Sequence, residues 1–193
     1  MNLTIPDAGG KENMNIFVVL SIFFWLLVFI YWIVKSRDKG ILNEIAGLAK
    51  LFFSGLVLHI PEFIPFKYFS YKQFFLTQIA GLLIISFGVF ICIWARECLS
   101  QNWSGKVIIQ REHALIKNGP YKIIRHPIYS GVLIMMFGSS IIIGNILGFI
   151  WVLFCFIGLY RKSKQEEDLL EKEFGKDYNE YKMDTKMIIP KIL

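Results

Sequence analysis

The run GPYKIIRHPIYSG at residues 119–131 places titratable side chains directly between two strongly apolar segments. It contains the basic residues Lys122, Arg125 and His126. Side chains of this kind bind anions, and an imidazole also takes up and releases a proton near neutral pH. An ordinary loop between membrane helices needs no such combination, so the run is the first candidate for a functional site.

Glycine and proline control the backbone of this run. Gly119-Pro120 is a turn signal, and Pro127 biases His126 towards the extended region. Because proline is favoured in the first turn of a helix, we expect the next helix to start near Pro127. Backbone N–H groups around residues 126–129 would then be available to a ligand. The alternative is a basic loop beneath the lipid headgroups, with its tyrosines at the interface.

The composition indicates the environment of these residues. The chain has 193 residues, of which 55% are hydrophobic, whereas a soluble domain has about 45–50% apolar residues. The excess lies in long runs, which indicates an integral membrane protein. The net charge of +6 does not indicate nucleic-acid binding, because the cations flank apolar runs, where membrane orientation explains them. The three cysteines lack metal-site spacing and predict neither a disulfide framework nor a metal centre.

Five helical spans account for the apolar runs, since a helix needs about 20 residues to cross a bilayer. The first run is too long for a signal peptide, so we expect a permanent span. The apolar run at residues 128–160 predicts a tight helical hairpin that turns at Gly144 and Asn145. We expect the aromatic residues of the first span, including Trp25 and Trp32, to face lipid. The sequence thus predicts an all-α membrane protein forming a single domain over residues 1–193, with spans at about 14–34, 41–60, 74–99, 128–143 and 145–160.

The basic residues predict the orientation of these spans. Residues 35–40, 96–127 and 160–193 hold 17 of the 21 Lys and Arg residues. This bias places the N-terminus outside and the C-terminus in the cytoplasm. The loop at 100–127 and the tail at 161–193 then share the cytoplasmic face and together form the candidate site. The charged tail predicts amphipathic helices on either side of Gly175 that rest on the membrane surface.

The motifs of the C-terminal half occur in a recognisable order. They are H-A-L-I at 113–116, G-P-Y at 119–121, R-H-P-I-Y-S-G at 125–131, E-E at 166–167 and L-x-x-x-F-G-x-x-Y-x-x-Y at 170–181. This set resembles the isoprenylcysteine carboxyl methyltransferase family, which consists of membrane enzymes that use S-adenosylmethionine. The resemblance covers about residues 100–190. It implies methyl transfer to a lipophilic or lipidated acceptor, first of all a carboxylate of the prenylcysteine type.

The resemblance also implies a cofactor pocket built from two cytoplasmic segments. Glu167 would reach across from the last helix to the ammonium group of the cofactor. A carboxylate acceptor needs no general base, whereas an amine or thiol would need one, and Glu167 and His126 are the candidates. His126 also belongs to the implied cofactor contacts, of which the others are Lys106, His113, Ala114, Leu115, Ile116, Tyr121, Pro127, Ile128 and Tyr129.

One position departs from the pattern of this family. Members that methylate prenylcysteine have an arginine four residues before the second glutamate, where this chain has Ser163. An arginine there could hold a substrate carboxylate by a bidentate contact. Ser163 therefore stands at a predicted substrate-binding position, and Arg161, Lys162 or Lys164 could supply the missing cation.

Two other functions are compatible with the sequence. Membrane sterol reductases resemble the same C-terminal pattern and use a nicotinamide cofactor, but they are usually much longer. A small transporter or membrane scaffold would bind no nucleotide-like ligand, and a transporter would more often show internal repeats. In every case we expect the bilayer as a partner, and neither nucleic acid nor a metal.

Overall fold

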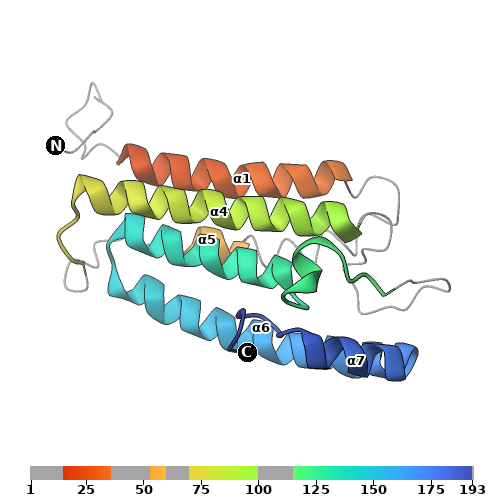
Figure 1. Cartoon of the computed structure of the whole chain (residues 1–193). Coiled ribbons are helices and arrows are strands. Elements are labelled where there is room, and N and C mark those ends of the chain that lie inside the picture. The colour runs from red at the N-terminus through yellow and green to blue at the C-terminus, as the bar shows by residue number, and fades with distance from the viewer. Residues whose placement is uncertain (1–14, 36–52, 60–69, 100–114, 193) are drawn as a thin grey trace.

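The computed structural model describes residues 15–35, 53–59, 70–99 and 115–192, and all regular elements in these ranges are helices. The predicted all-α fold is therefore confirmed. Apart from a short helix at 53–57, the described helices are, in chain order, α1 (Ile16–Lys35), α4 (Phe75–Leu99), the 3₁₀ helix η3 (Gly119–Lys122), α5 (Pro127–Ile143), α6 (Ile146–Phe174) and α7 (Lys176–Asp184) (Figure 1).

Three of these helices, α1, α4 and α6, are long and apolar enough to cross a membrane. The fourth apolar helix, α5, has 17 residues. Most of the second predicted span, at 41–60, lies outside the described residues, which include only a short helix at 53–57. α6 does not end near residue 160, where we placed the end of the last span, but continues to Phe174.

The four apolar helices lie side by side, and the chain order decides which ends meet (Figure 1). α1 and α4 both end where α5 begins and where α6 leads into α7 (Figure 1). We call this the α7 end of the bundle. The described parts of the first two basic regions, together with the end of α6 and α7, therefore lie at this end, while the residues after α7 turn back towards the middle of the bundle (Figure 1).

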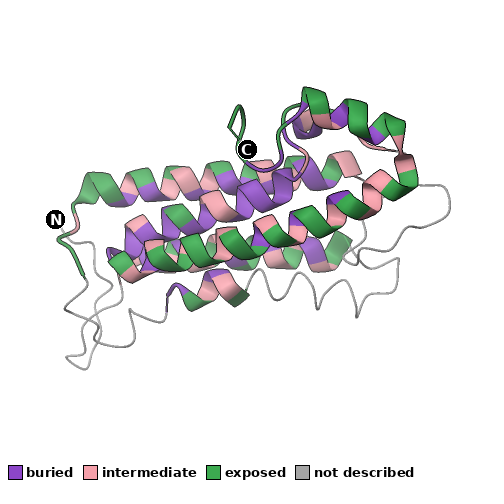
Figure 2. Cartoon of the chain, turned by 90° about the horizontal axis from the view of Figure 1, so that it is seen from below, coloured by how far each residue is buried: buried purple, intermediate pink, exposed green. Residues whose placement is uncertain are grey.

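Backbone contact fixes α5 against α4. A Cβ atom added to Gly88 would lie 2.7 Å from the carbonyl oxygen of Gly131, and one added to Gly138 would lie 2.7 Å from that of Gly81. Small residues allow two membrane helices to approach this closely. α5 is also the most buried helix, with 13 of its residues buried, compared with four of the 29 residues of α6 (Figure 2).

A buried hydrogen-bond cluster joins α1 to the same helix. The hydroxyl of Ser21 lies 3.1 Å from that of Ser139 and 3.0 Å from Nε2 of His59. Trp25 Nε1 donates to Ser139 Oγ at 3.0 Å. Trp25 and Trp32 are each only 1% exposed, so the expectation that they face lipid is wrong. Their face of α1 packs against the protein, where the indole N–H of Trp25 finds its acceptor.

The hairpin between α5 and α6 turns at the predicted residues. Gly144 adopts a left-handed backbone conformation with φ 68°, which favours glycine, and ends α5. The side chain of Asn145 accepts a hydrogen bond from the N–H of Leu147 at 2.9 Å and so caps the start of α6. The backbone N–H of Tyr71 donates to the Gly144 carbonyl at 2.8 Å and ties the turn to the segment before α4.

Replacing Gly88 with alanine should lower the free energy of unfolding by about 1–3 kcal/mol, because the new methyl group overlaps the α5 backbone. The matched control is Gly158→Ala in α6, where an added Cβ meets no described atom within 4 Å. That change should be neutral or stabilising by up to about 1 kcal/mol. Chemical unfolding in detergent micelles measures both, and equal effects would contradict close backbone packing of α4 and α5.

Candidate active site

The segment before α5 folds back onto the end of α4. Gly119 has φ 57°, and a Cβ there would collide with the sulfur of Cys98, so both its conformation and its surroundings require glycine. Pro120 lies in the first turn of η3, which confirms the predicted turn. The ring of Tyr121 is buried in the core. The backbone carbonyl of Tyr121 accepts a hydrogen bond from the Tyr181 hydroxyl at 2.7 Å.

α7 packs on this segment through one face. Tyr178 and Tyr181 are 1% and 6% exposed, while Lys182 Nζ lies 3.2 Å from Glu171 Oε2 on α6. Gly175, with φ 50°, separates the two helices as predicted. The tyrosine face of α7 is thus covered by the protein itself and not by a membrane surface, which corrects our expectation of a helix resting on the bilayer.

α5 starts at Pro127, as the sequence predicts, with His126 just before it at φ −123°. The N–H of His126, however, donates to the carbonyl of Met187 at 3.0 Å. The expectation that this N–H is free for a ligand is therefore wrong. The acceptor comes from the C-terminal residues, which pair with the segment before α5.

Five side chains from two segments form a buried site cluster: Arg125, His126 and Tyr129 around the start of α5, and Glu166 and Glu167 from α6. Arg125 Nε lies 2.6 Å from Glu167 Oε1. The hydroxyl of Tyr129 donates to Glu166 Oε1 at 2.6 Å. The His126 ring stacks on the Tyr129 ring at 5.5 Å between centroids, with Nδ1 at 3.5 Å from Glu166 and Nε2 at 3.5 Å from Glu167.

Charges in this cluster are buried but paired. The side chains of Arg125, His126 and Glu167 are only 9%, 8% and 4% exposed. A buried charge is tolerated only with compensating partners, and Arg125 has a second one because its Nη1 donates to the Thr185 carbonyl at 2.6 Å. Glu166 lies about 30 Å along α6 from Ile146, since a helix rises about 1.5 Å per residue. That length matches the bilayer core, so we expect the cluster at the membrane boundary.

The imidazole of His126 lies between two carboxylates. Burial alone would lower the pKa of His126, but Glu166 and Glu167 outweigh burial and raise the pKa above its usual value of 6.5. The protonated ring is therefore favoured in the folded protein. It offers N–H donors to both carboxylates at once.

Two buried polar atoms of the site lack hydrogen bonds within the described residues. The contact of His126 Nε2 to Glu167 lacks hydrogen-bond geometry. Ser163 is fully buried, and its hydroxyl also has no described partner. It lies one turn before Glu167, on the same face of α6. A buried polar group without a partner costs about 1–3 kcal/mol, so Ser163 Oγ is a candidate for a hydrogen bond to a polar ligand, whereas His126 Nε2 keeps its ionic contact with Glu167.

The three cations near Ser163 differ in their surroundings. Lys162 Nζ lies 3.7 Å from Glu166 Oε1 and 5.3 Å from the centre of the Tyr129 ring, so it borders the site cluster. Lys164 Nζ instead lies over the ring of Tyr160, and Arg161 is exposed.

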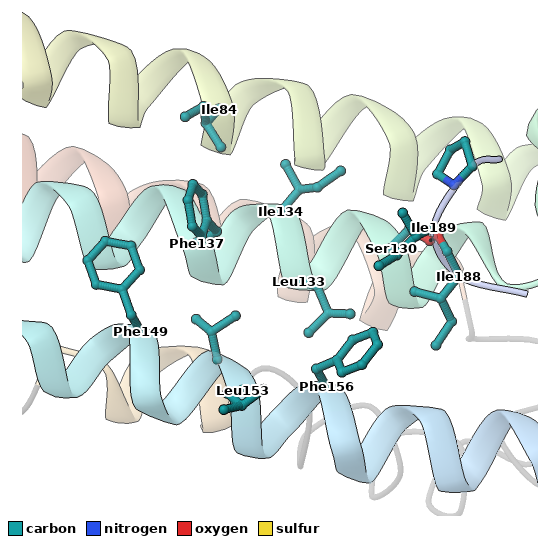
Figure 3. Close-up of a pocket in the computed structure, with 12 residues that line it drawn as sticks. Ile84, Ser130, Leu133, Ile134, Phe137, Phe149, Leu153, Phe156, Ile188 and Ile189 are labelled. Carbon is teal, nitrogen blue, oxygen red and sulfur yellow. Dashed lines mark hydrogen bonds between the residues drawn. The ribbon is translucent and has the colours of Figure 1, made fainter. Parts of the chain in front are cut away.

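An apolar cavity of about 520 Å³ begins at the first turn of α5. It lies between α5 and α6, and residues from α4 and from the C-terminal segment complete its wall (Figure 3). Among the described residues that line it, Ser130 alone has a polar side chain. Ser130 follows Tyr129 directly, so the first turn of α5 carries a residue of the site cluster and a residue of the cavity wall.

The structure brings together three of the predicted site residues, His126, Tyr129 and Glu167. Pro127 and Ile128 lie with them in the first turn of α5, and Leu115 and Ile116 are half-buried before η3. Lys106, His113 and Ala114 lie outside the described residues. Our selection omitted Arg125, Glu166 and Thr185. The first two stand next to selected residues in the same motifs, whereas no motif marked Thr185.

The fold and the site define a class of protein, an all-helical membrane protein with a buried ionic site at the membrane boundary. Comparison with known proteins identifies the family. The family described as phospholipid methyltransferase matches residues 76–177. The chain therefore belongs to the phospholipid methyltransferase family, and the predicted relationship to the isoprenylcysteine carboxyl methyltransferases is confirmed by its relatives.

These relatives include three named in similar terms. The protein-S-isoprenylcysteine O-methyltransferase of Dictyostelium discoideum is 29% identical over 71% of this chain and 59% of its own length. The probable enzyme of Oryza sativa subsp. indica is 30% identical over 64% of this chain and 65% of its own. Protein-S-isoprenylcysteine O-methyltransferase B of Arabidopsis thaliana is 27% identical over 94% of each chain. The chain thus spans less than two thirds of the first two relatives.

The thermal stability of the protein should fall as the pH rises above 6.5, because protonated His126 stabilises the fold between Glu166 and Glu167. A group whose pKa is raised in the folded state contributes its full stabilisation below its unfolded-state pKa. This stabilisation is lost as the pH rises through the folded-state pKa. His126→Gln removes this titration and should flatten that part of the profile. Melting temperatures in detergent at a series of pH values test this, and parallel profiles for both proteins would contradict it.

Proposed function

We propose that this chain is a membrane methyltransferase that transfers the methyl group of S-adenosylmethionine to a membrane-presented acceptor, a carboxylate of the prenylcysteine type. One observation carries the proposal: the first turn of α5 contributes Tyr129 to a buried ionic cluster and Ser130 to the wall of an apolar cavity. A water-soluble cofactor can reach the first from solution, and the hydrocarbon part of an acceptor can enter the second from the bilayer. The names of the relatives support the same reaction.

The residues of the site fit a cofactor that carries positive charge as well as a carboxylate. Glu166 and Glu167 suit an ammonium group. The buried hydroxyl of Ser163, which makes no hydrogen bond within the described residues, suits a polar group. S-adenosylmethionine, when bound, supplies the methyl group from its sulfonium. The role of the chain is to hold acceptor and cofactor in line and to exclude water, an effect that can contribute about 7–11 kcal/mol. Leu115, Ile116 and Tyr121 belong to the proposed cofactor contacts from the sequence motifs.

Arg125 orients the carboxylate of Glu167. Its Nε and the Nε2 of His126 both contact the same carboxylate oxygen, Oε1. This arrangement fixes the orientation of the Glu167 carboxylate. We therefore treat Glu167 and His126 as cofactor-binding residues. Of the two bases suggested by the sequence for an acceptor with a proton to be removed, Glu167 is the one available, because His126 can accept a proton only in its neutral form, which its raised pKa disfavours.

Lys162 is our candidate for the cation that holds the acceptor carboxylate. The family arginine is replaced by Ser163, which cannot neutralise a carboxylate. Lys162 is the neighbouring cation that borders Glu166 and Tyr129. Its side chain is 36% exposed, so its ammonium group can change partner when an anion enters.

We further propose that the α7 end of the bundle faces the cytoplasm and the N-terminus the outside. The excess of lysine and arginine at the α7 end supports this orientation. The cofactor would then bind from the cytoplasm.

The purified protein should bind S-adenosylhomocysteine with micromolar affinity and should not bind NADPH, measured by calorimetric titration in detergent. Glu167→Gln and Tyr129→Phe should each weaken this affinity about tenfold, equivalent to about 1.4 kcal/mol. Glu167→Gln removes a charge from the site cluster and Tyr129→Phe removes a hydroxyl, and each change retains the shape of the side chain.

The matched control is Glu173→Gln, which alters an exposed glutamate of the same helix and should leave the affinity unchanged. Unchanged affinity in both site variants, with the fold intact, would refute the site. Binding of NADPH alone would identify a reductase, and binding of neither ligand would favour a transporter or scaffold.

Lys162→Met should raise KM for N-acetyl-S-farnesylcysteine about tenfold and change the affinity for S-adenosylhomocysteine much less, because its contact with Glu166 is long, at 3.7 Å, and its side chain is 36% exposed. Transfer of a labelled methyl group from S-adenosylmethionine measures KM. Lys164→Met is the control, since this lysine lies over Tyr160 and away from the cluster. Equal effects of the two substitutions would argue against a specific role for Lys162.

A further inference from the structure

The C-terminal segment, residues 185–192, is bonded to the residues just before α5. The N–H of Arg125 donates to the Lys186 carbonyl at 2.8 Å. Together with the bond from His126 to Met187, this contact forms a short parallel pairing. The position of the C-terminal segment is therefore tied to two residues of the site cluster.

Ile188 sets the depth of this segment relative to the membrane. Its carbonyl accepts a hydrogen bond from Ser130 Oγ at 2.5 Å, and its side chain is only 1% exposed. Ser130 lies in the first turn of α5 and follows Tyr129 of the site cluster, which we expect at the membrane boundary. Ile188 then lies near the level where the lipid headgroups meet the first acyl carbons.

The next four residues, 189–192, form a tight turn, which we call the C-terminal turn. The N–H of Ile192 donates to the carbonyl of Ile189 at 3.2 Å. Pro190 occupies the second position, and Lys191, with φ 66°, the third. These are features of a type II turn, whose third position favours glycine. The turn itself therefore does not require a lysine at position 191.

The side chains of the C-terminal turn combine apolar surface with a positive charge. Ile189 and Ile192 are 37% and 76% exposed, and the exposed Lys191 stands between them. At a membrane boundary, apolar side chains enter the acyl region while an ammonium group reaches the lipid phosphates. The two parts of this surface thus match the two parts of a phospholipid.

The helix before the turn has a different surface. The tyrosine face of α7 is covered by the protein, and apart from Met183 its exposed residues are charged or polar. From the end of α7 the chain runs back towards the middle of the bundle (Figure 1). The apolar contact with lipid that the sequence predicted for the charged tail therefore fits the C-terminal turn better than it fits α7.

We propose that the C-terminal turn is a membrane anchor that binds phospholipid, with Ile189 and Ile192 among the upper acyl carbons and Lys191 at a phosphate group. Because the same segment accepts hydrogen bonds from Arg125 and His126, the anchor holds the start of α5 and its ionic cluster against the bilayer. This inference goes beyond the proposed function and stands whichever reaction the site performs.

Photolabelling of the full chain in phosphatidylcholine nanodiscs tests where the turn lies. A phosphatidylcholine with a diazirine in one acyl chain should label residues 189–192 as well as Ile157, which is 41% exposed on the membrane helix α6. Met183 of α7 is the matched control, since it is 78% exposed and should stay unlabelled. Labelling of Ile157 without residues 189–192, or equal labelling of Met183, would overturn the proposal.

Hydrogen exchange in the same nanodiscs tests whether the anchor holds the segment. Ile192→Asp should make the N–H groups of Arg125 and His126 exchange about tenfold faster, because a charge in the turn opposes its entry into the acyl region. Met183→Asp places the same charge on α7 and should leave this exchange unchanged. Equal effects of the two substitutions would contradict an anchor at the turn.

The role of the cation is tested by replacing phosphatidylcholine with anionic phosphatidylglycerol. This change should slow the exchange of the same N–H groups in the unmodified protein, and Lys191→Gly, which suits the turn, should reduce the slowing. Lys176→Gln is the control, since Lys176 of α7 has a side chain that is 90% exposed. A slowing that Lys191→Gly leaves intact would refute the phosphate contact. None of these readouts depends on S-adenosylhomocysteine, so they are separate from the test of the proposed function.

Discussion

The ion pair between Arg125 and Glu167 holds the functional end of this protein together. Glu167 belongs to α6, and Arg125 belongs to the segment before α5. A second nitrogen of the guanidinium group, Nη1, donates to the carbonyl of Thr185 in the C-terminal segment. Removing one partner of a buried pair leaves the other charge without compensation, which typically costs about 3–5 kcal/mol. Three segments distant in sequence therefore take their positions from a single guanidinium group. The carboxylate that it fixes is the one expected to meet the ligand.

This ion pair can form only because the helices that bring its partners together are themselves rigidly placed. The glycine contacts between α4 and α5 bring two backbones together, and Gly119 lets the next segment return over the end of α4. The start of α5 is thereby fixed in depth and rotation. α6 touches this core with few buried residues, so its polar end depends more on ionic contacts than on apolar packing.

Much of the site was predictable because its motifs are local. The turn at Gly119-Pro120, the helix start at Pro127 and the hairpin at Gly144 each follow from one or two residues with restricted backbones. The family resemblance implied that His126, Tyr129 and Glu167 share one pocket, but it did not predict their direct contacts or the part of Glu166 in them. The pairing of residues 186–187 with the segment before α5 was not predictable. It consists of backbone hydrogen bonds between residues about 60 positions apart in the sequence, and no side-chain pattern marks them. The burial of Trp25 was missed because an aromatic residue on a membrane helix suits lipid and protein equally.

The uninterrupted course of α6 links the site to the membrane itself. Its 29 residues span about 44 Å, whereas the hydrocarbon core measures about 30 Å. The helix that carries Glu166 and Glu167 is thus also the helix whose tilt responds to the thickness of the surrounding bilayer. With no break between its two parts, the part of α6 that spans the membrane and the part that carries the carboxylates form one unit. Any change in its tilt would have to be taken up by the contacts of these carboxylates with Arg125, His126 and Tyr129.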